Sequence, residues 1–303
     1  MHILVIYYSQ TGQLKKILTT LFEQNTDVEV DYVPIIPVKD FPFPWKAHQF
    51  FDAMPECVLQ IPEEIHPLKI PNKRYDLVVL GHNPWFLSPC LPINSFLKSS
   101  QASILQNQKV LTVIGARNMW LNAQEQVKAD LVSLGALLVG NIVLVDPRPN
   151  LISVLTIIRW TFKGIKEKTR LLPEAGIPEE EIKRVKDYGS IIIQTLKSQQ
   201  WPSLQEKLLA QKAVVVQPGL VVLEKRGITN FRKFAAKIIA KGKRGDSARK
   251  PLVTLFQRLL VVGVFILSPI SNFTAWLSTQ VNRKALAKKI NYFQGVGFEK
   301  DSL

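Results

Sequence analysis

Short strand-like segments recur through the first half of the chain, and stretches of helical periodicity separate them. A continuous apolar run bounded by turn residues is typical of a strand that is buried on both faces of a parallel sheet. Strands that alternate with helices predict an α/β fold in which helices cover both faces of one parallel sheet. We expect five strands, at residues 2–8, 28–33, 75–81, 110–115 and 137–145.

The segments between these strands carry helix and loop signals. Apolar side chains in residues 13–22 recur at the spacing of one helix face, which predicts a helix there. A second helix is expected over residues 122–134. The proline-rich segment 34–45 is expected to be an extended loop.

Charge divides the chain into two unlike halves. The whole sequence has 39 Lys and Arg residues and 24 Asp and Glu residues, which gives a net charge of +15. Residues 1–150 contain 12 basic and 13 acidic side chains, whereas residues 151–303 contain 27 and 11. We therefore expect two domains, an α/β domain at 1–150 and a basic, apolar, mainly helical extension at 151–303.

The second half contains three segments that suit a helical extension. Residues 177–181 (IPEEE) predict a helix start, because proline and acidic side chains are favoured in a first turn. Residues 228–241 place apolar and basic side chains as in a helix that lies on a membrane surface. Residues 259–277 contain no charged side chain and are flanked by basic ones. Because this segment includes Pro269 and several polar residues, an interfacial hairpin or a buried helical subdomain is favoured over a membrane span.

The turn after the first strand has the composition of an anion site. Ser9, Gln10, Thr11, Gly12 and Gln13 join a buried strand to a helix. Hydroxyl groups and backbone N–H groups at a helix N-terminus can surround a phosphate, and glycine lets the backbone come close to it. The turn lacks the glycine patterns of nucleotide triphosphatases and of dinucleotide folds. It therefore predicts a terminal phosphomonoester as ligand, with an ordinary capped turn as the alternative.

Two further loops fall at the same edge of the predicted sheet. Residues 81–92 follow the third strand, and residues 115–120 follow the fourth. Ligands of open parallel sheets bind outside the carboxyl ends of the strands. Trp85 offers a flat face for stacking on a planar ring, and Arg117 and Asn118 can donate hydrogen bonds to ring oxygens.

These loops resemble those of known proteins. The strand followed by SQTGQ and the loop NPWFLSPCLP resemble the corresponding parts of flavodoxin-like FMN proteins. The strings VIYYSQTGQL, GARNMWLNAQEQ, GNIVLVD and NLISVLTIIRW are similar to those of flavodoxin-like proteins named dialkylresorcinol-condensing (DarA-like) enzymes. That family belongs to bacterial pathways for dialkylresorcinols and flexirubin-type pigments. The resemblance is dense over residues 1–175 and general beyond them.

The resemblance implies a flavodoxin-like sheet that binds FMN at the three loops. The first loop would hold the phosphate, the second would border the isoalloxazine, and the third would line its pyrimidine side. The residues implied to bind FMN are, loop by loop, Ser9, Gln10, Thr11, Gly12, Gln13 and Leu14; Asn83, Pro84, Trp85, Phe86 and Leu87; and Gly115, Ala116, Arg117 and Asn118.

Oxidation fits this sequence better than condensation. Condensation of acyl thioesters needs a nucleophile such as a cysteine activated by histidine, and neither Cys57 nor Cys90 lies in a ketosynthase signature. We therefore expect an FMN-dependent oxidoreductase that aromatises a lipophilic dialkyl-cyclohexanedione to a dialkylresorcinol, beside a partner ketosynthase. His82 and His48 are the candidate bases, and Arg117 is the candidate cation that stabilises the reduced flavin.

Three other functions stay open. Electron-carrying flavodoxins have no substrate of their own, but they are usually acidic and end after the fifth strand. An NAD(P)H-dependent quinone reductase of the same fold would also use FMN. A condensing enzyme, as the family name says, is the third alternative.

The remaining expectations concern partners and place. Basic residues are not interleaved with base-stacking aromatic residues on a recognisable module, so nucleic acid is not an expected partner. Basic residues beside apolar segments favour an anionic membrane surface. The N-terminus lacks the charged start of a signal peptide, so we expect a cytoplasmic protein. Together with the basic, apolar segments, this predicts a peripheral position on the inner membrane. No metal site is expected, since two cysteines cannot form a four-thiolate site, and a homodimer is a further expectation.

Overall fold

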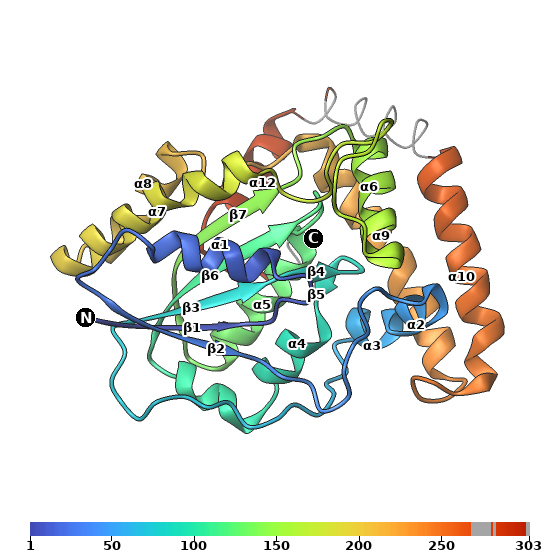
Figure 1. Cartoon of the computed structure of the whole chain (residues 1–303), viewed down its shortest axis with the longest axis horizontal. Helices are drawn as coiled ribbons and strands as arrows, with labels where there is room; N and C mark the ends of the chain where they lie inside the picture. The colour runs from blue at the N-terminus through green and yellow to red at the C-terminus, as the bar shows by residue number, and fades with distance from the viewer. Residues whose placement is uncertain (268–279, 281–282, 301–303) are drawn as a thin grey trace.

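A single sheet of five parallel strands forms the centre of the molecule (Figure 1). The structure is a computed structural model, and it describes residues 1–267, 280 and 283–300. Across the sheet, the order of the strands along the sequence is second, first, third, fourth and fifth, which is the flavodoxin-like order. From one edge to the other the strands are β2 (Glu29–Pro34), β1 (His2–Tyr7), β3 (Leu77–His82), β6 (Lys109–Ala116) and β7 (Leu137–Val145).

The predicted α/β fold is confirmed, and each strand ends within two residues of its expected position. Alternate side chains of β1 enter opposite layers: Ile3 and Val5 join the core on one face, and Leu4 and Ile6 join the core on the other. Because both faces of this strand are buried, its sequence has to be a continuous apolar run.

Helices cover both faces of the sheet. One face packs against α1, α7 and α8, and the other packs against α4 and α5. The helix predicted at 13–22 is α1, and the acid-rich start predicted at 177–181 begins α7. The five helices are α1 (Gln13–Phe22), α4 (Leu91–Leu97), α5 (Leu121–Ser133), α7 (Glu179–Ser198) and α8 (Leu204–Ala210).

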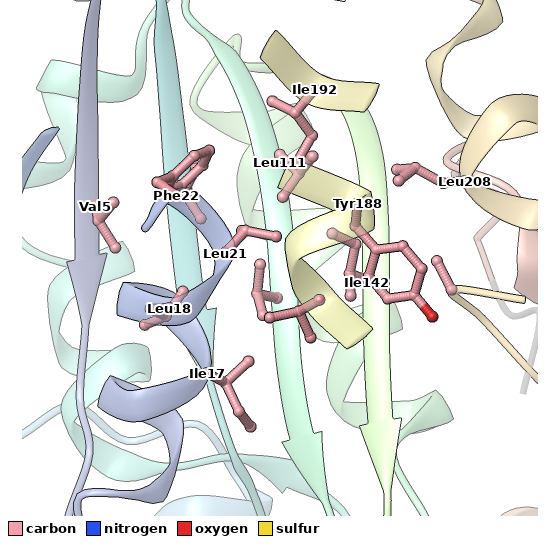
Figure 2. Packing of buried hydrophobic residues seen from close by; sticks show 14 of the residues in the cluster. Val5, Ile17, Leu18, Leu21, Phe22, Leu111, Ile142, Tyr188, Ile192 and Leu208 are labelled. Atoms are coloured by element: carbon pink, nitrogen blue, oxygen red, sulfur yellow. The ribbon is translucent and has the colours of Figure 1, made fainter. Parts of the chain in front are cut away.

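Helices α1 and α7 cross at very short distance. Figure 2 shows Leu18 and Leu21 of α1 on the same side of the sheet as Tyr188 and Ile192 of α7. Gly189 lies at the crossing, where a Cβ atom would stand 1.7 Å from the carbonyl oxygen of Leu21. Only glycine permits this approach.

The domain boundary predicted at residue 150 does not separate two cores. Ile192 of α7 and Leu208 of α8 are fully buried in the same cluster as Val5 and Leu111 of the sheet (Figure 2). The apolar face of the sheet would stay exposed without α7 and α8. The α/β unit therefore extends at least to Ala213, the last residue of this cluster.

A second group of helices covers the edge of the sheet at which the strands end (Figure 1). Helices α6, α9 and α10 come from the second half of the chain and meet α2 and α3, which lie between β2 and β3 in the sequence. Phe51 and Met54 of the first half and Ile228 and Phe256 of the second share one apolar cluster. The five helices are α2 (Ala47–Asp52), α3 (Met54–Val58), α6 (Asn150–Lys163), α9 (Pro218–Ile239) and α10 (Lys250–Val262).

The amphipathic segment predicted at 228–241 belongs to α9, and its apolar side packs inside the protein. Ile228 and Ala235 are fully buried in the cluster with α2 and α3. Phe231 packs edge-on against Phe256 of α10, with ring centroids 5.2 Å apart. The expectation that this face lies on a membrane is therefore wrong for α9.

No helix of the described residues is both long and apolar enough to cross a bilayer. Of the segment predicted at 259–277, the first part ends α10 and forms the short segment η4, while residues 268–277 lie outside the described residues.

The helix α12 packs Leu286 and Phe293 near the ends of β6 and β7. The remaining elements are β4 (Pro84–Trp85), β5 (Ser88–Pro89), η1 (Ser100–Leu105), η2 (Trp201–Ser203), η3 (Ser247–Arg249), η4 (Gly263–Leu267) and α12 (Arg283–Gln294).

A buried ion-pair cluster fastens α10 to the first half of the chain. Arg249, which is fully buried, places Nη1 2.6 Å from Glu56 Oε1 and Nε 3.1 Å from Asp52 Oδ1. The backbone N–H of Gly245 donates to Asp52 Oδ2 at 2.7 Å. Buried charges are tolerated only when they are paired, so this cluster fixes where α10 begins.

Candidate functional site

The loop after β1 is open and polar. Thr11 and Gly12 are exposed, and Gly12 has a φ of 80°, in the left-handed region that favours glycine. Ser9 Oγ accepts a hydrogen bond from the backbone N–H of Lys15 at 3.1 Å. The loop leads directly into α1, and the first amides of a helix have no acceptor within the helix. It therefore gathers two hydroxyl groups and several N–H groups at the positive end of the α1 dipole.

Gln10 and Gln13 use their side chains to hold neighbouring segments. Gln13 Oε1 accepts a hydrogen bond from the N–H of Ile177, and its Nε2 donates to the Ile177 carbonyl, both at 3.1 Å. Gln10 Oε1 accepts from Trp45 Nε1 at 2.9 Å, and its Nε2 donates to the Pro42 carbonyl at 3.2 Å. The backbone N–H of Gln13 donates to Thr11 Oγ1 at 3.5 Å, within the loop.

The loop after β3 turns back as the short hairpin of β4 and β5. Phe86 and Leu87 have φ values of 49° and 62°, as a two-residue hairpin turn with two left-handed residues requires. Asn83 donates from Nδ2 to the carbonyl of Gly115 at 2.7 Å. This hydrogen bond ties the hairpin to the end of β6.

Trp85 lies within an aromatic cluster instead of standing alone. The rings of Tyr8, Phe41 and Trp45 approach it edge-on, with centroids 5.8, 5.1 and 5.7 Å away. These rings come from the end of β1 and from the proline-rich loop, so the cluster joins three segments at the carboxyl edge. The indole is half-buried and fixed in position.

The loop after β6 meets the start of α6. Arg117 Nη1 donates to Asn150 Oδ1 at 2.6 Å, and Asn118 Nδ2 donates to the same oxygen at 3.0 Å. Burial lowers the pKa of Arg117 to about 10, and Asp146 opposes that shift, so the guanidinium stays charged at neutral pH. Asn118 Oδ1 is buried and has no hydrogen-bond partner among the described residues.

The three loops meet at one place because β1, β3 and β6 are neighbours in the sheet. The carboxyl ends of parallel strands lie at the same edge of the sheet. Here helices α6, α9 and α10 pack over that edge (Figure 1). The structure thus brings to one edge the three loops with the predicted cofactor residues Ser9, Gln10, Thr11, Gly12, Gln13, Leu14, Asn83, Pro84, Trp85, Phe86, Leu87, Gly115, Ala116, Arg117 and Asn118. The side chain of Leu14 is buried in the core.

The two candidate bases lie in unlike environments. His82 is fully buried at the end of β3, and its Nε2 lies 3.1 Å from Gln124 Oε1. Burial lowers the pKa of His82 to about 4, so the imidazole is neutral and enclosed. This corrects the prediction that His82 is a candidate base, because the buried ring is not open to a ligand. His48 lies half-buried on α2, and its Nε2 has no hydrogen-bond partner within the described part of the chain.

Both thiols lie inside the core. Cys57 and Cys90 are fully buried, and burial raises the pKa of both thiols, that of Cys90 to about 12. A protonated and enclosed thiol is a poor nucleophile. Among the described residues, no three His, Cys, Asp or Glu side chains form a group that could hold a metal ion.

Glu224 of α9 does not line the site but contacts a helix that holds the hairpin in place, and the sequence alone did not identify it. Its carboxylate is fully buried, and Oε1 accepts a hydrogen bond from the N–H of Asn122 in the first turn of α5 at 2.8 Å. Asn122 in turn donates from Nδ2 to the Leu87 carbonyl at 2.6 Å. Helix α9 therefore fixes the hairpin through α5. The available signal was that Glu224 is the single acidic residue of residues 218–239.

Asn150 was missed for a different reason. It sits at the predicted domain boundary, and a boundary gives no cause to assign its side chain to the loop after β6. The contact with Arg117 and Asn118 shows that α6 belongs to the same site as that loop.

Comparison with known proteins finds similar folds. No protein-family model and no curated protein matches the chain. A flavoprotein in complex with FMN from Lactobacillus acidophilus NCFM is 19% identical, with a TM-score of 0.37, over 47% of this chain and 92% of that one. A putative flavoprotein from Bacteroides uniformis ATCC 8492 is 15% identical, with a TM-score of 0.38, over 60% and 96%. A WrbA-like flavodoxin from Agrobacterium tumefaciens is 12% identical, with a TM-score of 0.36, over 65% and 98%. These similarities concern the fold, which the strand order defines independently.

Proposed function

We propose that the chain is a flavoprotein that binds FMN at the carboxyl edge of β1, β3 and β6. The observation that carries the proposal is the junction of the loop at residues 9–13 with the N-terminus of α1, at the point where the strand order reverses. Open α/β sheets bind their ligands at such a reversal, and flavodoxin, which has this strand order, binds FMN there.

The residues present fit the cofactor at both of its ends. At the phosphate end, Ser9 and Thr11 supply hydroxyl groups, and no described atom beyond Gly12 and its two chain neighbours lies within 4 Å of the position that a Cβ on Gly12 would take. At the ring end, the buried Oδ1 of Asn118 can accept a hydrogen bond from a ring N–H. Residues of the loops after β3 and β6 would hold the ring between them.

The finer proposal is an oxidoreductase that aromatises a dialkyl-cyclohexanedione to a dialkylresorcinol, with the preceding condensation carried out by a partner ketosynthase. When bound, the flavin supplies a two-electron acceptor. The ring of the substrate then has to lose a hydride and a proton, and the chain has to take up that proton. The buried thiols offer no nucleophile for condensation, which supports oxidation as the reaction.

His48 is the side chain of this chain best suited to take up the proton. His48 is only half-buried and its Nε2 has no hydrogen-bond partner in the described residues, whereas His82 is fully buried and its Nε2 lies 3.1 Å from Gln124 Oε1. His48 also lies on α2, directly after the proline-rich loop that Gln10 binds. Arg117 supplies the positive charge at the other side of the site.

An anaerobic single-turnover experiment tests this proposal. FMN-loaded protein is mixed with a synthetic dialkyl-cyclohexane-1,3-dione, and the visible flavin absorbance and the organic product are followed. The proposal predicts bleaching of the flavin and one equivalent of dialkylresorcinol, with slower bleaching in His48→Gln. Reduction by NADPH and reoxidation by a quinone, without reaction of the dione, would select the quinone reductase instead. Reaction with neither substrate would select an electron carrier.

A further inference from the structure

Helix α10 carries an apolar stripe that the protein does not cover. Leu255, Leu259 and Val262 are spaced four and three residues apart, and Ile266 continues the stripe in η4. Their exposed fractions are 45%, 47%, 41% and 64%. The opposite face of the helix holds Val253 and Phe256, which are buried. This stripe is therefore not the face that fastens α10 to the protein.

Helix α6 carries a second stripe of the same spacing. Leu151, Leu155 and Ile158 are exposed, whereas Val154 and Trp160 on the other side are buried. The stripe runs toward Phe162, whose ring packs against α2.

The two helices flank the same element. The ring of Phe51 on α2 lies 6.4 Å from that of Phe162 on α6 and 6.2 Å from that of Phe256 on α10. Figure 1 shows α6 and α10 at the same end of the molecule, beyond the carboxyl edge of the sheet. The two helices that carry the stripes therefore lie beside the candidate cofactor site.

Positive charge surrounds the two stripes. Residues 150–172 contain five basic side chains and one acidic one. Residues 240–267 contain six and one, and two of the six are paired with acidic side chains elsewhere: Arg249, which is buried, and Arg244, which contacts Glu63. Lys163, Lys168 and Arg170 near α6 are exposed, and so are Lys250 and Arg258 on α10. Apolar side chains next to exposed basic ones are the pattern of a surface that inserts shallowly between anionic headgroups.

We propose that the stripes of α6 and α10 form a docking surface for an anionic lipid membrane. The charge decides the occupant: two copies joined through this surface would bring exposed lysine and arginine side chains together, whereas an anionic membrane neutralises them. The surface would place the mouth of the carboxyl edge against the lipid, where a dialkyl substrate partitions. The surface stands independently of the flavin, because none of its residues belongs to the cofactor loops.

Vesicle flotation tests the surface with the full-length protein. The probes are vesicles of phosphatidylcholine alone and vesicles that also contain phosphatidylglycerol, each at low and at high salt. The proposal predicts binding to the phosphatidylglycerol vesicles at low salt, weaker binding at high salt, and little binding to neutral vesicles.

Two double variants and one control locate the surface. L255Q/L259Q removes the α10 stripe, and L151Q/L155Q removes the α6 stripe. The control V132Q/L137Q changes two exposed apolar residues of α5 and β7 that lie outside both stripes. Each stripe variant should weaken binding to the anionic vesicles by about tenfold or more, and the control should bind as the unmodified protein does.

The outcomes are distinct. Unchanged binding in both stripe variants, or no binding to phosphatidylglycerol vesicles at low salt, would overturn the proposal. A homodimer by light scattering that the stripe variants dissociate, without vesicle binding, would assign the surface to a second copy instead. Circular dichroism of the variants establishes that they fold. FMN binding measured on the same samples reports on the cofactor site separately.

Discussion

The Oε1 atom of Glu224 lies 2.8 Å from the backbone nitrogen of Asn122, so that a carboxylate of α9 caps the N-terminus of α5. Glu224 is fully buried, and burial raises its pKa to about 7, while the hydrogen bonds from the backbone of α5 oppose that shift. A side chain from the basic half of the chain thus stabilises a helix of the α/β unit and, through Asn122, the hairpin of the site.

This relationship predicts a pH dependence of stability. The pKa of Glu224 is raised in the folded protein, so the folded state binds its proton more tightly than the unfolded state does. The contribution is complete below the ordinary pKa of 4.5 and is lost as the pH rises through about 7. The loss amounts to at most about 3 kcal/mol. Urea denaturation between pH 5 and pH 8 should show this decline in the unmodified protein and a flatter profile in Glu224→Gln; parallel profiles would contradict the assignment.

The buried Arg249 predicts a large loss of stability on truncation. Arg249→Ala leaves the carboxylates of Glu56 and Asp52 buried without their partner, which should cost about 3–5 kcal/mol. Arg258→Ala is the matched control, because this arginine is exposed on α10, the helix that follows Arg249, and it should change the free energy of unfolding by less than about 0.5 kcal/mol. Chemical denaturation measures both; similar effects of the two variants would show that the ion-pair cluster does not fasten α10.

The α1–α7 crossing predicts that Gly189 does not tolerate a methyl group. Gly189→Ala would place Cβ against the carbonyl oxygen of Leu21, so the helices must move apart, at a cost of about 2 kcal/mol or more. Gly219→Ala in α9 is the control: no described atom beyond its chain neighbours and the adjacent helix backbone lies within 4 Å of its Cβ position, and it should be neutral or stabilise by up to about 1 kcal/mol. Thermal unfolding compares the two, and equal midpoints would argue against close contact of the helices.

The position of Arg117 predicts an effect on the flavin potential. Loss of the half-buried guanidinium in Arg117→Ala should lower the two-electron reduction potential of bound FMN by tens of millivolts, because the reduced anion loses a nearby positive charge. Arg117→Lys keeps the charge and should retain most of the potential. Spectroelectrochemical titration measures both variants. An unchanged potential in Arg117→Ala would remove Arg117 from the flavin environment.

The periodic parts of the fold could be predicted from the sequence. Strand β1 and helix α1 lie where their apolar patterns place them, and α7 begins at its proline and three glutamates. These signals are local, since burial on one or two faces dictates the residues of each element. The same local signals gave the loop at residues 9–13 and its place before α1.

Contacts between distant segments could not be predicted in this way. The carboxamide of Gln13 binds the backbone of Ile177, 164 residues away, and no local pattern specifies that partner. His82 looked available because it follows a strand, yet its side chain points into the core toward Gln124. The basic, amphipathic character of residues 228–241 reflects a helix whose apolar side packs on the protein, because composition does not reveal which surface covers an apolar face.

Binding of FMN and of riboflavin to the full-length protein tests the central claim most directly. Quenching of flavin fluorescence should show one FMN per chain and binding of riboflavin weaker by about tenfold or more, because riboflavin lacks the phosphate that the loop at residues 9–13 would hold. S9A/T11A should weaken FMN binding toward the level of riboflavin, whereas S133A/T229A, which removes hydroxyl groups bonded within their own helices, should not. Equal affinity for FMN and riboflavin, or no binding of FMN, would contradict the account.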